Sequence, residues 1–507
     1  MTRTPRIVRA ATGAALIVPA LVLAGCAGGT GGTTSESPAS EPDPDATLRL
    51  GLVLEPTNLD IRHTSGAALE QILVGNVYEG LVTRTQENEI APSLATEWEV
   101  SDDGLTYTFT LADGVTFHSG AELTAQDAVS SIDAVVSDES IVGHDDLTGV
   151  ASVEAPDDAT VVITLSQPNQ NLLFALTGPA GLVFDEGDTT DLQTAANGSG
   201  PFALEEWNQG DSIVLARNDS YWGDPAGVAE VVASYIPDFT AGVNAALDGS
   251  LDVLTGVDPQ LAPQLDGTNG FTITKGKTTD KFVLGFNNAV APLDDVRVRE
   301  ALRLAIDHDA LVETIGAGAT QYGPIPELDP GYEDLSDVAP YDPERAEELL
   351  AEAGQDDLEL ELTIPSFYGT TASTFLVSAF HDIGVELTVN PVEFSTWLQD
   401  VYANGDYQLS FVNHVEPRDF GAWANPDYYF HYDNADVQEL YAQALETIDA
   451  DESAELLAEA ARIVSEDHAS DWLYTGETIV AVGPGVSGFP VDSVSSRIDL
   501  SSVTIAD

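Results

Sequence analysis

A short run in the last fifth of the chain gathers charged groups that are able to recognise a charged small molecule. Arg418 stands between Glu416 and Asp419 in the run Glu416-Pro417-Arg418-Asp419. A guanidinium holds a carboxylate through two parallel hydrogen bonds, so Arg418 beside Glu416 or Asp419 is suited to a zwitterion. An internal arginine–aspartate pair that stiffens the loop explains the same residues equally well. The sequence leaves both interpretations open.

Aromatic and imidazole side chains surround this charged run. Trp423, Tyr428 and Tyr429 follow it, and flat rings pack well against peptide side chains or sugar rings. Packing in the protein core is the alternative for each ring. His414 and His431 flank the run and are candidate partners of a bound metal chelate. The eight histidines include no pair at i, i+3 or i+4, so we predict no metal site belonging to the protein itself. A metal site built from ligands far apart in the sequence is the alternative.

Motifs of catalysis are missing from the sequence. There is no Gly-x-Ser-x-Gly, no His-Glu-x-x-His, no glycine-rich phosphate loop with a lysine and no EF-hand loop. Paired acids carry no information in a chain with 85 Asp and Glu. We therefore predict no enzyme activity and no cofactor. A surface hydrolase that acts on peptides or glycans through carboxylate pairs is the alternative from another class.

The only cysteine, Cys26, ends the segment Leu23-Ala24-Gly25-Cys26. Three arginines within the first nine residues and an apolar run over residues 10–24 precede it, as in a secretory signal peptide. The segment resembles a bacterial lipobox, in which the signal is cut before a cysteine that carries lipid. A small core cysteine behind an ordinary signal is the alternative. We predict a signal peptide over 1–25, a flexible linker over 26–45, and anchoring to the outer face of the cell membrane.

Acidic residues dominate the composition. The chain has 17 Lys and Arg against 85 Asp and Glu, which gives a formal net charge of −68. Such a surface repels nucleic acid and anionic lipid headgroups, and both salt adaptation and a general composition bias would produce it. No segment after Cys26 offers the ~20 unbroken apolar residues of a membrane helix. Membrane attachment is therefore expected through the lipid alone, and a monomer is expected.

Strand and helix patterns alternate along the chain and predict an α/β protein. Residues 107–111 alternate as a strand, and residues 150–165 read as a hairpin with its turn at 155–158. Thr124 and Asp127 are placed to cap one helix. Asp342-Pro343 begins another helix, which Gly354 ends. A further helix carries three arginines among acids, and we expect them to form surface ion pairs: Arg297, Arg299 and Arg303.

A series of short motifs follows in order along the chain. The series begins with Tyr78-Glu79-Gly80-Leu81, Pro92-Ser93-Leu94-Ala95 and Ser101-Asp102-Asp103-Gly104-Leu105-Thr106-Tyr107-Thr108-Phe109. It continues with Gly114-Val115-Thr116-Phe117-His118-Ser119-Gly120, Gly198-Ser199-Gly200-Pro201-Phe202, Phe286-Asn287, Asp294-Asp295-Val296-Arg297 and Gly323-Pro324-Ile325-Pro326. The series resembles the extracellular solute-binding proteins of family 5, which are the peptide, nickel and oligosaccharide receptors of ABC importers.

The resemblance implies a two-lobed α/β fold of the periplasmic-binding-protein type II, with the extra domain of cluster C. On that pattern lobe I takes residues 46–78, 191–277 and 476–507, the extra domain takes 79–190, and lobe II takes 278–475. Two crossings of the chain, near 277 and 475, would form a hinge on which the lobes close around a ligand.

The resemblance also implies a function and a site. It implies a lipid-anchored substrate-binding protein that captures peptides in the cleft between the lobes and delivers them to the permease of an ABC importer. Receptors for nickel chelates, other metallophores or oligosaccharides are the alternatives. In this family the loop of lobe II that corresponds to the charged run faces the cleft, and peptide receptors place an acid there; Arg418 departs from that pattern. The implied ligand contacts are His414, Glu416, Arg418, Asp419, Trp423, Tyr429 and Asn287.

Overall fold

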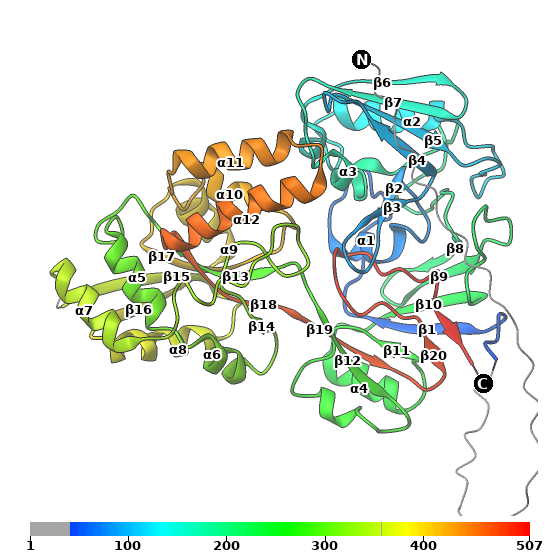
Figure 1. Cartoon of the computed structure of the whole chain (residues 1–507). Coiled ribbons are helices and arrows are strands. Elements are labelled where there is room, and N and C mark those ends of the chain that lie inside the picture. Colours follow the sequence, from blue (N-terminus) through cyan, green and yellow to red (C-terminus); the bar gives the residue numbers. More distant parts are fainter. Residues whose placement is uncertain (1–40, 356, 507) are drawn as a thin grey trace, which may run out of the picture. The chain divides into compact units, whose positions relative to one another are not determined.

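The computed structural model describes residues 41–355 and 357–506, and Glu41–Asp507 form one compact unit. The predicted signal peptide, Cys26 and most of the predicted linker lie outside the described residues. Strands and helices interleave along this unit, which confirms the α/β class (Figure 1). Within residues 41–355 and 357–506, no helix combines the length and the apolar character that crossing a membrane requires.

A seven-stranded sheet, ordered β12-β19-β11-β1-β10-β9-β8, is built from both ends and the middle of the chain. Its strands are β1 (Thr47–Leu52), β8 (Phe202–Asn208), β9 (Ser212–Arg217), β10 (Glu230–Tyr235), β11 (Val253–Leu254), β12 (Thr272–Lys277) and β19 (Glu477–Val482). β1 runs parallel to β10 and β11. Leu48, Leu50 and Leu52 are fully buried, so the leucines of β1 belong to the core. Helices α1 (Ala67–Leu73) and α4 (Phe239–Leu247), the turn η3 (Ala262–Gln264) and the short pair β20 (Val486–Ser487) and β21 (Thr504–Ile505) accompany the sheet.

A six-stranded sheet, ordered β14-β18-β13-β17-β15-β16, organises residues 281–475. Its strands are β13 (Lys281–Phe286), β14 (Ala319–Thr320), β15 (Glu359–Pro365), β16 (Glu386–Val392), β17 (Leu409–His414) and β18 (Ser470–Thr475). Its helices are α5 (Val296–Leu304), α6 (His308–Ile315), α7 (Pro343–Ala353), α8 (Thr370–Asp382), α9 (Phe394–Trp397), the π-helical turn η4 (Leu398–Ala403), α10 (Gly421–Ala424), α11 (Ala435–Glu446) and α12 (Ala450–Glu466). α7 begins and ends as predicted: Asp342 accepts from the N–H of Arg345, and Gly354 takes a left-handed φ of 74°.

A four-stranded sheet, ordered β4-β5-β7-β6, forms a smaller body within residues 95–165. Its elements are β4 (Ala95–Val100), β5 (Thr106–Leu111), β6 (Val150–Asp157), β7 (Thr160–Leu165) and α2 (Ala125–Ser137); β2 (Val82–Arg84), β3 (Ile90–Pro92), α3 (Leu172–Ala175) and the turns η1 (Asp145–Leu147) and η2 (Pro179–Gly181) lie nearby in sequence. The predicted capping box of Thr124 and Asp127 is present. The predicted hairpin is also present, but its turn lies at Asp158 and Ala159, because β6 continues through Asp157.

The chain passes between the two large sheets twice. β12 ends at Lys277 and β13 begins at Lys281, while β18 ends at Thr475 and β19 begins at Glu477. The Asp280 carboxylate ties the two crossings together, since it accepts hydrogen bonds from the Thr278 hydroxyl and, at 3.0 Å, from the Gly476 N–H. The predicted domain boundaries and the predicted hinge stay predictions.

The arginines of α5 differ from expectation. Arg297 forms the expected surface pair, with 2.6 Å from its Nη2 to Asp295 Oδ2. Arg299 and Arg303 are only 7% and 1% exposed, so the prediction of surface pairs was wrong for them. Arg303 donates to Ser465 O at 2.6 Å and reaches the buried Asp471 at 3.2 Å. These partners lie on α12 and β18, far from α5 in the sequence.

Candidate ligand-binding site

Arg418 lies in the loop after β17 and is held there by its main chain and by an aromatic ring. Its φ is 55°, and its N–H donates to Asp329 Oδ2 at 3.1 Å. Its guanidinium lies 4.1 Å from the centre of the Phe174 ring, a cation–π contact, and makes a long 3.5 Å contact with Asn171 Oδ1. Burial lowers the pKa of the Arg418 guanidinium, while the charge of Asp329 opposes this change.

The guanidinium of Arg418 lacks a carboxylate partner among the residues that the structure describes. Its Nε is buried without a hydrogen-bond partner in that part of the chain. Asp419 pairs with Lys281 and His414 instead, and Glu416 is exposed. The internal arginine–aspartate ion pair considered from the sequence is therefore not formed by Arg418, although its backbone is anchored on Asp329.

A second guanidinium meets the same phenylalanine ring. Arg84, at the end of β2, lies 4.4 Å from the centre of Phe174 and donates to Asn88 Oδ1 at 3.2 Å and to Val494 O at 2.8 Å. Burial lowers the pKa of Arg84 to about 10, and the charges of Arg418 and Arg497 add to this effect. Positive charge is thus concentrated at one place in a protein that is acidic elsewhere.

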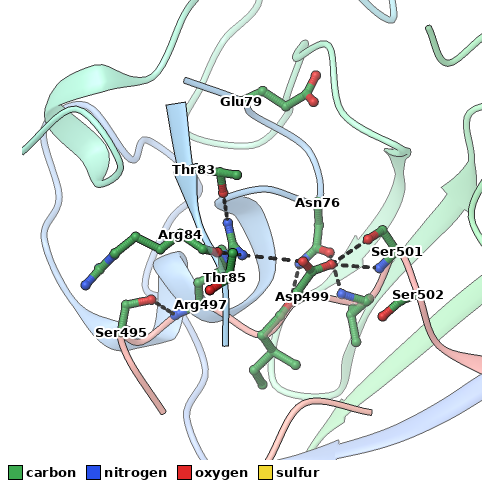
Figure 2. A network of polar contacts seen from close by, with 12 residues as sticks. Asn76, Glu79, Thr83, Arg84, Thr85, Ser495, Arg497, Asp499, Ser501 and Ser502 are labelled. Carbon is green, nitrogen blue, oxygen red and sulfur yellow. Dashed lines mark hydrogen bonds and ion pairs between the residues drawn. The ribbon is translucent and has the colours of Figure 1, made fainter. Parts of the chain in front are cut away.

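A polar network from the C-terminal segment holds the strand that carries Arg84 (Figure 2). Arg497 donates to the Thr83 hydroxyl and, at 2.8 Å, to the carbonyl oxygen of Arg84. Asp499 lies 3.4 Å from Arg497 and accepts hydrogen bonds from the main chain and the hydroxyl of Ser501. These contacts fix the backbone from which the Arg84 side chain extends.

Asn88 joins the turn between β2 and β3 to the segment 324–330. Its Nδ2 donates to Asp329 Oδ1 and to Leu328 O, both at 2.9 Å. Asp329 is 6% exposed, and burial raises the pKa of its carboxyl, although the charges of Lys281 and Arg418 oppose the rise. Asn88, Asp329 and the Arg418 backbone therefore form one continuous set of contacts between segments far apart in sequence.

A first cavity, of about 680 Å³, lies where these segments meet. One wall comes from residues 87–107 and 170–173, and the other from 324–330, Arg418, α11 and α12. The Gln170 N–H donates to Leu445 O at 2.8 Å and closes one side. Trp98, Tyr107 and Tyr441 contribute rings to walls that also carry Asn88, Asp329 and Arg418. This volume and mixed lining suit a small ligand.

A second cavity, of about 570 Å³, adjoins the first, since Arg418, Asp419 and Tyr441 line both. The end of β17 and the loop after it, residues 412–416, form one wall. Aromatic rings form much of the rest: Phe394, Trp397, Tyr402, Tyr428 and Tyr429.

A chain of polar groups connects the lining of the second cavity to the buried Lys281. Lys281, which is fully buried, pairs with Asp419 Oδ1, and His414 Nδ1 lies 2.9 Å from Asp419 Oδ2. His414 Nε2 lies 2.9 Å from the Tyr429 hydroxyl. Burial alone would raise the pKa of the Asp419 carboxyl, but Lys281 and His414 outweigh it and the pKa is lowered. Asp419 is therefore a charged group whose two oxygens are already engaged within the protein.

The residues predicted from sequence fall into two groups. His414, Glu416, Arg418, Asp419 and Tyr429 line the second cavity. The two others lie in the core and line neither cavity. Trp423 is fully buried and donates to Ser470 Oγ at 3.2 Å, while the amide of Asn287 donates to Gly405 O and Tyr407 O, both at 3.0 Å. Their ligand roles stay predictions.

Sequence reasoning missed several residues at the site. Arg84, Asn88 and Asp329 escaped notice because their local sequence resembles ordinary turns and surface charge. The scarcity of basic residues was the available signal for Arg84, since the chain contains only 17 Lys and Arg. Nothing local indicates that Asn88 meets Asp329.

Comparisons with known proteins agree with this architecture. Residues 89–458 match the family described as bacterial extracellular solute-binding proteins, family 5 Middle. The chain is 27% identical over 462 residues to the glutathione-binding protein GsiB of Salmonella typhimurium, covering 85% of this chain and 90% of that protein. It is 30% identical over 308 residues to heme-binding protein A of Haemophilus influenzae, covering 55% of this chain. That alignment spans only 56% of the relative's own length.

Solved structures show the same fold. HbpA2 from Haemophilus parasuis superposes with a TM-score of 0.84 at 22% identity, covering 91% of this chain and 100% of the other. The murein tripeptide binding protein MppA, in its unliganded open form, superposes with a TM-score of 0.82 at 21% identity. The superposition covers 93% of this chain and 99% of MppA. These likenesses confirm the predicted two-lobed binding-protein fold.

Proposed function

The chain belongs to the bacterial extracellular solute-binding proteins of family 5, and from this premise we propose that it captures peptides and delivers them to the permease of an ABC importer. Members of the family bind solutes, so the chain is a binding protein and not an enzyme, and the surface-hydrolase alternative is rejected. The proposed binding place is the pair of adjoining cavities that share Arg418.

The observation that carries the peptide proposal is the state of Arg418. Arg418 lines both cavities, and no carboxylate among the described residues forms an ion pair with its guanidinium. A cation that has lost part of its hydration is stabilised by a bound anion. The planar guanidinium of arginine matches the geometry of a carboxylate. The carboxyl terminus of a peptide supplies that group, and the relative named for glutathione binding takes a ligand of this class.

The second charge of a zwitterionic peptide requires a free acid. Asp419 is engaged by Lys281 and His414, whereas Glu416 is exposed and lines the second cavity. We assign the ligand ammonium group to Glu416. No observation favours a nickel-chelate ligand, because Asp419 and Tyr429 contact both ring nitrogens of His414.

The cellular setting of the proposal rests on Cys26 and on the family description. Cys26 stands at the predicted lipobox, outside the described residues, and the matching family is described as extracellular. We propose that lipid on Cys26 holds the protein on the outer face of the cell membrane, within reach of the permease.

Calorimetry with tripeptides that carry a free or an amidated carboxyl terminus tests the peptide proposal. Wild type should prefer the free acid, and Arg418→Ala should weaken acid binding by ~2–4 kcal/mol and lose the preference. Arg418→Lys should restore little, because an ammonium cannot form the two-bond fork. Arg462→Ala is the control, since Arg462 pairs with Glu333 away from both cavities. Equal binding of acid and amide by wild type would reject a carboxylate site at Arg418.

A further inference from the structure

We infer that the second cavity receives an aromatic side chain at the carboxyl end of the peptide, and that Phe394 and Tyr402 set this preference. The inference rests on the proposed function, because it takes the ligand carboxylate to be held by Arg418. Neither the family description nor the names of the relatives indicate this side-chain preference.

The rings around the cavity divide into fixed inner rings and open outer rings. Trp397 and Tyr429 are 4% and 2% exposed, and Trp397 is fixed by a 2.9 Å hydrogen bond from its Nε1 to Ser410 Oγ. Phe394 and Tyr402 are 43% and 49% exposed, although both line the cavity. Large aromatic surfaces left open beside a buried aromatic floor are typical of a binding pocket.

The geometry between the rings is that of an aromatic cluster with room for another member. Phe394 stacks on Trp397 with centroids 5.8 Å apart and planes 8° apart. Tyr402 meets Tyr428 edge to face at 5.7 Å and 90°. Aromatic pairs favour both arrangements, so a further ring entering the cavity finds faces and edges already in position.

Two residues that line this cavity, Asn413 and Arg418, each carry a buried polar atom without a hydrogen-bond partner among the described residues. Asn413 Oδ1 is buried without a partner among the described residues, while its Nδ2 donates to Asp280 Oδ2 at 2.7 Å. Arg418 Nε is buried and unpartnered in the same part of the chain. Arg418 lines the same cavity as the rings. A ligand carboxylate held by Arg418 would therefore place the last residue of a peptide beside them.

The charges beside the rings favour a neutral aromatic group over a cationic side chain. Aromatic rings also attract cations, but Arg418 lines this cavity, and the carboxylate of Asp419 is already paired with Lys281. A ligand lysine would therefore meet positive charge, and Glu416, the other acid in this lining, is already assigned to the ammonium group of the ligand.

Calorimetry with three free-acid tripeptides tests the inference: Ala-Ala-Phe, Ala-Ala-Ala and Ala-Ala-Lys. Wild type should bind Ala-Ala-Phe about tenfold or more tightly than either of the others, as expected for burial of one aromatic side chain. The double variant Phe394→Ala, Tyr402→Ala should bring the three affinities to within about threefold. Tyr341→Ala is the matched control, because Tyr341 is 55% exposed and lines neither cavity.

The outcomes separate this inference from the proposed function. Equal binding of Ala-Ala-Phe and Ala-Ala-Ala by wild type would overturn the aromatic pocket and leave the peptide proposal standing, as would an unchanged preference in a double variant that melts like wild type. A preference for Ala-Ala-Lys would overturn it in favour of a cationic side chain. If wild type bound no free-acid tripeptide of any sequence, the proposed function would fail and the inference with it.

Discussion

At the scale of single residues, Glu79 is a buried acid held entirely by neutral donors. It is 5% exposed and accepts hydrogen bonds from Tyr221 at 2.7 Å, Ser199 at 2.8 Å and Trp222 at 3.2 Å. Burial raises the pKa of its carboxyl to about 7, although the three donors oppose the rise. The folded protein therefore takes up a proton on Glu79 at a pH where the unfolded chain does not.

The sign of the resulting pH dependence follows from this difference. Between the ordinary pKa of 4.5 and about 7 the folded state binds the extra proton, so the free energy of unfolding falls as the pH rises. The contribution is at most ~3 kcal/mol. We expect Glu79→Gln to remove this contribution to the dependence of the unfolding free energy on pH. Urea unfolding at a series of pH values between 4.5 and 7 measures that dependence. The exposed Glu205→Gln should leave the slope unchanged, and parallel curves for Glu79→Gln and wild type would contradict the prediction.

At the scale of elements, the side chain of Asn88 joins the turn between β2 and β3 to the segment 324–330 by hydrogen bonds. Asn88 has a φ of 63°, so Asn88→Gly keeps the backbone conformation and removes only the side chain. We expect this variant to bind Ala-Ala-Phe ~1–2 kcal/mol more weakly, because Asp329 loses a donor at the cavity wall.

Asn269→Gly is the control for the Asn88→Gly variant. Asn269 also has a positive φ, of 52°, and its amide donates to Leu247 O, far from the cavities. Calorimetry should give the wild-type affinity for this variant. If Asn88→Gly also bound like wild type, the contact between the two segments would have no part in ligand binding.

The elements also show which features a sequence reveals. The helix that begins after Asp342 and the capping box at Thr124 were predictable, because their signals lie within a few residues. Arg303 was not, because its burial depends on Asp471, which is 168 residues away.

The residues of the candidate site also differ in how far the sequence predicts them. The charged loop around Arg418 stood out by composition, whereas Asn88, 241 residues from Asp329, had no local signal.

At the scale of the whole molecule, Cys26 is predicted to decide where the protein resides. The compact unit Glu41–Asp507 does not contain it. We therefore expect Cys26→Ser to release a folded protein from the membrane, measured by fractionation together with thermal melting. Retention of the variant in the membrane fraction, or loss of a cooperative melting transition, would contradict the lipobox interpretation.

Ligand binding is predicted to change the whole molecule. A ligand in the first cavity would contact Tyr107 on one wall and Tyr441 on the other, and would draw those walls together. We expect saturating Ala-Ala-Phe to reduce the radius of gyration in small-angle scattering and to raise the melting temperature. Mass action gives ~2.7 kcal/mol of added stability at a ligand concentration 100 times Kd. Bound peptide with both quantities unchanged would argue against a closing receptor.

The place of β19 in the seven-stranded sheet has a consequence for biosynthesis. β19, residues Glu477–Val482, lies between β12 and β11, so this strand near the C-terminus joins strands that emerge from the ribosome some 200 residues earlier. Until it is translated, β11 and β12 have exposed edges that invite pairing with other chains. A chain that stalls before Glu477 therefore cannot complete this sheet. The completion of this sheet therefore has to wait until residues 477–482 have been translated.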